Sequence, residues 1–219
     1  MIKDKVSAPV TPSPNAQLPQ KLQGKIRLSK GDKSVIIEKT PSIAATVSWR
    51  SGTDYDIYAL VMTKSGKEFA VATFGAKDVP PCMDYGNGAV HHRGDVVGNS
   101  SGESVEVIDI RPDTDIVAVV PVAYSAQSNG TGSFYHYKVS LEIDNNQGTV
   151  VTLSAENANN KSTIYSCVPG IIYNRPDGLK IEALELYSKP SSEKRPKLTL
   201  KEDGTVLVNM DKGPRNDYK

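Results

Sequence analysis

Apolar and polar residues alternate in short runs along most of this chain, beginning near Gly24. The runs include "SVIIEK", "AATVSW", "DIYALVM", "SVEVIDI" and "GTVVTLS". An apolar residue at every second position is typical of β-strands with one buried face. Turn-forming stretches such as "KGDK", "KSGK" and "RPDG" separate the runs. Because no segment has an apolar face of helical period, the pattern predicts an all-β fold, a two-sheet β-sandwich of many short strands.

The same pattern divides the chain into three parts. Residues 1–22 are rich in Pro, Ser, Ala and Gln and have no strand period, so we expect a disordered or extended arm. Residues 23–187 carry the alternating runs and form the predicted sandwich. In residues 188–219, a polar linker leads to two further runs around Asp203-Gly204, which predicts a C-terminal hairpin and tail.

One predicted strand carries two acids. In "TDYDIYALVM", alternation places Asp54 and Asp56 on the same face, two positions apart. Like charges at that spacing repel each other. This face therefore needs a cation or a binding partner.

An oxygen-rich loop further along the chain could supply the rest of a cation site. It spans Asp95 to Glu103 and contains Asp95, Asn99, Ser100, Ser101, Gly102 and Glu103. Hard divalent cations bind carboxylates, amides and backbone carbonyls. If the loop closes over the acidic strand, a calcium ion can lie between them. The alternative is that both stretches are solvated turns, where the same residue types are common.

Composition and motifs narrow the class of function. Since the formal net charge is only +1, it does not indicate nucleic acid or an anionic membrane as partner. The chain has no apolar run long enough to span a bilayer. The isolated cysteines, Cys82 and Cys167, fit a reducing cytosol better than a disulfide framework.

The sequence motifs give no sign of catalysis. His91 and His92 are adjacent in the sequence, so their rings should point to opposite faces of a strand. No nucleophile elbow, phosphate loop or dinucleotide fingerprint is present, and we expect a protein that is not an enzyme.

Three stretches, in this order, resemble one family. They are "IRLSKGDKSVIIEK", "VSWRSGTDYDIYALVM" and "GNGAVHHRGDVVGNSSGESVEVIDI", and the resemblance covers roughly residues 24–187. The sequence is similar to the TerD-type stress protein domain of tellurium resistance.

This resemblance implies a non-enzymatic, calcium-binding β-sandwich in the cytoplasm of a bacterium, or one encoded by a phage. The implied metal ligands are Asp54, Asp56, Gly94, Asp95, Asn99, Gly102 and Glu103. The chain departs from the family pattern at Tyr58, Val96 and Ser104, where that pattern has oxygen ligands. Because each departure removes a possible ligand, one calcium site is expected rather than two.

The segments outside the resemblance suggest a second function. An arm and a hairpin are parts that an assembly subunit uses to reach a neighbouring chain. The alternative hypothesis is therefore a structural or assembly protein, such as a phage particle component, built on a TerD-like sandwich with a partly degenerate calcium site. It would self-associate or bind a partner through these two segments.

Overall fold

The computed structural model describes residues 21–50, 53–95, 102–129, 133–155 and 162–217. Most of the N-terminal arm and Asn99 of the expected site lie outside these ranges. Within them, the chain forms one short 3-10 helix and a series of strands, in the order β1 (Gly24–Leu28), β2 (Val35–Ile37), β3 (Ile43–Arg50), β4 (Asp56–Thr63), β5 (Glu68–Val71), β6 (Asp84–Tyr85), β7 (Val90–His92), β8 (Glu103–Ile110), β9 (Ile116–Tyr124), η1 (Gln127–Asn129), β10 (Ser140–Asp144), β11 (Thr149–Ser154), β12 (Ser166–Arg175), β13 (Gly178–Tyr187), β14 (Lys197–Leu200) and β15 (Val206–Asn209). No helix of the described residues is long and apolar enough to cross a membrane.

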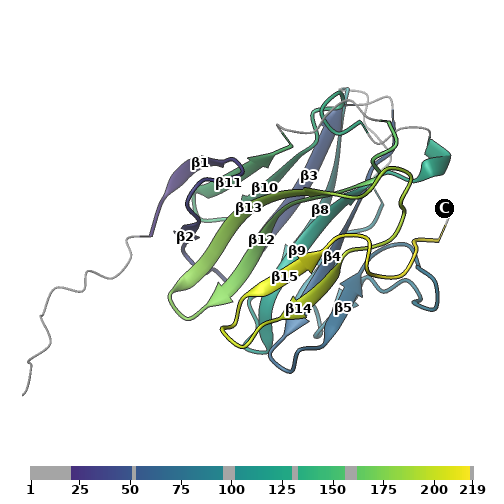
Figure 1. The fold of residues 1–219 in the computed structure, drawn as a ribbon. Helices are drawn as coiled ribbons and strands as arrows, with labels where there is room; N and C mark the ends of the chain where they lie inside the picture. Colours follow the sequence, from purple (N-terminus) through teal and green to yellow (C-terminus); the bar gives the residue numbers. More distant parts are fainter. Residues whose placement is uncertain (1–20, 51–52, 96–101, 130–132, 156–161, 218–219) are drawn as a thin grey trace, which may run out of the picture.

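Two large sheets form the body of the molecule (Figure 1). Sheet A has the strand order β1-β11-β10-β3-β8-β7-β6, and sheet B has the order β2-β13-β12-β9-β4-β5. Neighbouring strands are antiparallel, except for β1 and β11, which are parallel. The sheets pack face to face and do not close into a barrel, which confirms the predicted β-sandwich.

The main core lies between the two sheets. Every second residue of β3 is buried, from Ile43 to Trp49, and the side chains of β4 that face sheet A include Ile57 and Val61. The only tryptophan, Trp49, is 2% exposed. Alternation along the strands therefore correctly identified the residues that fill this core.

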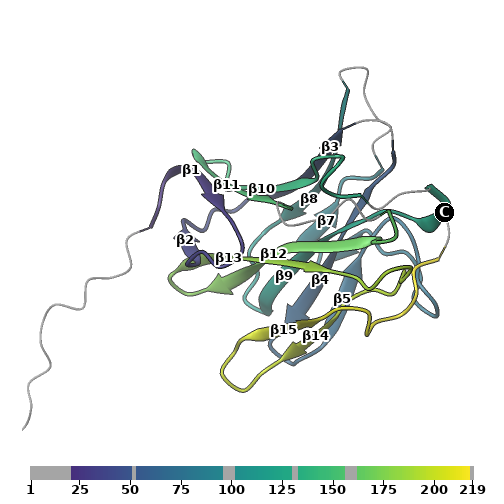
Figure 2. The same cartoon turned by 45° about the horizontal axis from the view of Figure 1, so that its top comes forward.

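A third layer covers the outer face of sheet B (Figure 2). The β14–β15 hairpin buries Leu198, Val206 and Val208 against the side chains of β4, β9 and β12 that point away from sheet A. All eight residues of β4 are consequently buried, because both of its faces are covered. The hairpin turn lies where Asp203-Gly204 predicts it, with Asp203 Oδ1 accepting a hydrogen bond from the Thr205 N–H.

Two local features differ from the sequence pattern. Residues 84–92 have the polar composition of a loop, yet they form the β6–β7 hairpin. Its turn contains Asn87 and Gly88, both with positive φ, a backbone conformation that asparagine and glycine adopt at low cost. Residues 135–138, which begin the strand-like run "YHYKVSLEI", form turns instead, and β10 begins only at Ser140.

Candidate metal centre

The candidate site lies at the N-terminal end of β4 in sheet B, where this strand contacts β7 and β8 of sheet A. Strand β5 pairs with β4 only from Ala59 to Met62, so it does not reach Ile57. The Ile57 N–H donates to Glu106 Oε2 at 2.7 Å, and its carbonyl is 2.8 Å from His92 Nε2. Two buried polar side chains of sheet A therefore satisfy the backbone of β4 at this point.

The hydrogen bonds of His92 define its protonation state. Because the Ile57 carbonyl can only accept, Nε2 carries the proton. Nδ1 accepts a hydrogen bond from the Gly94 N–H at 3.0 Å, so it has no proton. His92 is thus a neutral imidazole. One ring nitrogen donates to the backbone of β4, and the other accepts from the backbone segment that leads to Asp95.

Three carboxylates come together beside this histidine. One carboxylate oxygen from each of Asp56, Asp95 and Glu106 lies within 4.8 Å of the others. Asp56 and Glu106 are buried and Asp95 is exposed. Arg93 holds the chain before Asp95 in place, through two hydrogen bonds of 2.8 Å to Asp109 of β8.

Burial changes the acidity of Glu106. Loss of hydration raises the pKa of its carboxyl to about 8, and a hydrogen bond with the Asp95 side chain and the negative charges of Asp56 and Asp95 act in the same direction. The bond from the Ile57 N–H opposes this rise. Glu106 Oε1 is buried and has no hydrogen-bond partner among the described residues. Without a cation, Glu106 therefore holds a proton at neutral pH, and a divalent cation would replace that proton.

Of the metal ligands expected from the sequence, the structure brings only two into the three-carboxylate group. Asp56 and Asp95 are brought together, from the acidic strand and the later loop respectively. Asp54 is exposed, precedes the first residue of β4 and is not part of the three-carboxylate group. The Gly94 N–H donates a hydrogen bond to His92. Gly102 is exposed and has positive φ. The backbone of Glu103 lies opposite that of Arg50, where β8 begins to pair with β3.

Sequence reasoning missed Glu106, and it named His92 without assigning it to the site. Both lie on strands whose alternation was readable: Glu106 shares the inner face of β8 with Ile108, and His92 shares the inner face of β7 with Val90. A charged residue at a buried position of a strand is rare unless it binds a partner. The glutamate of "SVEVIDI", on the same alternating face as Ile108 and Ile110, is that signal in the sequence.

The fold and site define a β-sandwich with an oxygen-only acidic cluster between the two sheets. No family model matches the chain, and no curated protein matches it. Among solved structures, the chain is similar to a crystal structure of SAV2460, a protein of unknown function, with a TM-score of 0.52 and 16% sequence identity. The match covers 70% of this chain and 94% of that one. At this identity the likeness supports the fold alone.

Proposed function

We propose that this chain is a non-enzymatic, calcium-binding protein of the TerD stress-protein type. The observation that carries the proposal is the convergence of Asp56, Asp95 and Glu106, whose oxygens lie within 4.8 Å of one another. Two of these acids come from the stretches in which the TerD-type pattern has its metal ligands.

The geometry and chemistry of the group fit calcium. Two oxygens bound to one calcium ion lie at most about 5 Å apart, twice the usual metal–oxygen distance. The donors are all carboxylate oxygens, which hard cations prefer, and the nearby His92 uses Nε2 for the Ile57 carbonyl. The unsatisfied Oε1 of Glu106 is a further buried acceptor available to a cation. Asp56, Asp95 and Glu106 would hold the ion through their carboxylate oxygens.

The position of the group supports a binding role rather than catalysis. Two of its three carboxylates, those of Asp56 and Glu106, are fully buried, which leaves little access for a substrate. A cation there would connect β4 of sheet B with β8 of sheet A and with the segment around Asp95. The effect that we propose is therefore stabilisation of one end of the sandwich.

Thermal melts test the proposal. A ligand that binds only the folded state at one hundred times its dissociation constant adds about 2.7 kcal/mol to the free energy of unfolding. For a domain of this size, that raises the melting temperature by roughly 5–10 °C. We expect this shift with calcium relative to chelator, and a smaller one with magnesium, which demands a tighter octahedral shell.

Variants make the test specific to the three acids. Asp95→Ala and Glu106→Gln should abolish the calcium-dependent shift. Asp54→Asn is the matched control, because it removes an acid from the same stretch but outside the group, and its shift should equal that of the wild type. Superimposable wild-type melts in calcium and chelator would contradict the proposal, as would loss of the shift in Asp54→Asn alone.

A further inference from the structure

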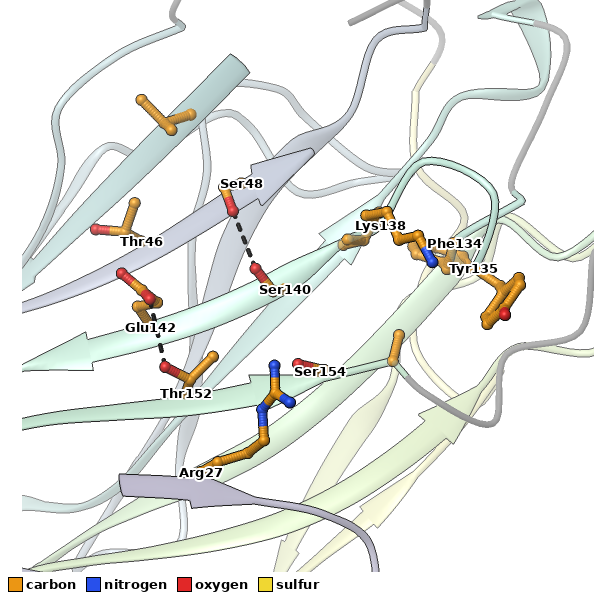
Figure 3. A pocket seen from close by; sticks show the side chains of 13 residues that line it. Arg27, Thr46, Ser48, Phe134, Tyr135, Lys138, Ser140, Glu142, Thr152 and Ser154 are labelled. Atoms are coloured by element: carbon orange, nitrogen blue, oxygen red, sulfur yellow. Dashed lines mark hydrogen bonds between the residues drawn. The ribbon is translucent and has the colours of Figure 1, made fainter. Parts of the chain in front are cut away.

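The outer face of sheet A carries a hollow of about 610 Å³ (Figure 3). Its floor is a row of short side chains that runs across neighbouring strands: Ser154 pairs with Ser140, and Ser140 pairs with Ser48. Longer side chains flank the row on one side, where Glu142 lies between Thr152 and Thr46.

The floor is rich in hydroxyl groups. Ser48 and Ser140 are hydrogen-bonded to each other at 3.0 Å, and Thr152 donates to Glu142 at 3.3 Å. Each hydroxyl can both donate and accept, so this surface can bind a ligand with many hydroxyls of its own. With strands about 4.8 Å apart, the row from β11 through β10 and β3 to Val105 of β8 extends about 14 Å, which is long enough for a short oligomer.

Two cations border the hollow. Arg27 reaches it from β1 and Lys138 from the turn before β10 (Figure 3). Neither forms a salt bridge with any residue in the described part of the chain. Lys138 Nζ lies 4.6 Å from the centre of the Tyr135 ring, and Tyr135 is 45% exposed. An exposed aromatic ring beside a polar groove offers an apolar face to a ligand.

We propose that this hollow binds an acidic oligosaccharide. The sugar hydroxyls would bond to the serine and threonine row, a ring could pack against Tyr135, and carboxylate groups would pair with Arg27 and Lys138. A peptide strand fits less well, because strand addition needs a free sheet edge, and β11, β10 and β3 are paired on both sides. The proposal does not depend on the metal centre, which lies between the sheets.

Calorimetric titration with hexagalacturonate, in the presence of chelator, tests this inference. Chelator removes calcium, so failure of the calcium proposal cannot affect the result. We expect saturable binding that weakens as salt is raised, and much weaker binding of the neutral maltohexaose. Arg27→Ala and Lys138→Asn should each weaken binding about tenfold, through loss of one charge-assisted hydrogen bond. Asparagine is chosen at position 138 because the residue has φ of 55°, which asparagine tolerates.

The controls separate a built site from general charge attraction. Lys25→Ala removes the same charge from the same exposed face of β1 as Arg27→Ala, but lies outside the hollow, so binding should be unchanged. Ser140→Tyr should fill the hollow and abolish binding while the melting curve shows a folded protein. Equal binding of maltohexaose, wild-type affinity in both cation variants, or equal affinity for inorganic phosphate would each overturn the proposal.

Discussion

The guanidinium carbon of Arg195 lies 4.9 Å from the centre of the Tyr58 ring and 5.1 Å from that of Phe74. Arg195 is 2% exposed, and its guanidinium donates to the carbonyls of Phe74 and Gly75 and to Asn216 Oδ1. In the resemblance stated from the sequence, Tyr58 stands where the TerD-type pattern has an aspartate. The Tyr58 ring packs against Arg195, and this contact attaches the segment after β13 to the outer face of sheet B.

Replacing Arg195 should destabilise the protein strongly. In Arg195→Met the two carbonyls and Asn216 Oδ1 lose their buried donor, which should lower the free energy of unfolding by about 3 kcal/mol and the melting temperature by roughly 10 °C. The control is Lys194→Ala, which changes an exposed neighbour and should leave the melt almost unchanged. Equal melts for the two variants would show that the buried arginine contributes little.

The β14–β15 hairpin should be an integral part of the fold. Leu198 is 4% exposed, and its N–H donates to the Glu68 carboxylate. Leu198→Asp places a charge in that apolar layer, so we expect a loss of about 3 kcal/mol, measured by urea unfolding. Thr199→Asp, one position along on the exposed face, should cost less than about 0.5 kcal/mol. If both variants unfold at the same urea concentration, the hairpin is not a required layer.

The pKa of Glu106 predicts how stability depends on pH in chelator. Its folded-state pKa of about 8 lies above the ordinary value of 4.5, so between these pH values the folded chain binds more protons than the unfolded chain. The free energy of unfolding should therefore fall as pH rises from about 5 to about 8. Glu106→Gln cannot ionise and should flatten this dependence. A wild-type profile equal to that of the variant would mean that Glu106 ionises normally.

Trp49 provides a spectroscopic readout of the proposed metal centre. Its indole N–H donates to the Thr53 carbonyl at 3.1 Å, and its ring packs edge-on against Tyr55. Because Trp49 is buried, its emission should be blue-shifted in the native protein. Because Thr53 and Tyr55 lie just before Asp56, calcium bound at Asp56 should alter this emission. The change should be absent in Asp95→Ala. An emission maximum typical of exposed tryptophan would contradict the burial of Trp49.

Local pattern was enough to predict much of the fold and part of the site. Alternation identified the strands, because one buried face imposes a period of two on a sequence wherever it occurs. It also placed Asp56 on a strand, whereas Asp95 was singled out by the oxygen-rich composition of its loop. It did not predict that Asp54 would be exposed, because the strand begins only at Asp56. The pairing of Glu106 with the Ile57 N–H depends on which strands of the two sheets lie opposite each other, and a tertiary relationship of that kind has no signature in either segment alone.

The strands at one edge of each sheet have a consequence for how the chain folds. β1 pairs with β11 and β2 pairs with β13. Each of these first strands can pair only after a segment on the order of a hundred residues further along the chain has been made and folded. Closing loops of that length costs entropy before any contact forms, and domains dominated by such distant pairings fold slowly. The first two strands of the described residues are therefore among the last to find their neighbours, and until then the open edges of β11 and β13 are available to other molecules of the same newly made chain.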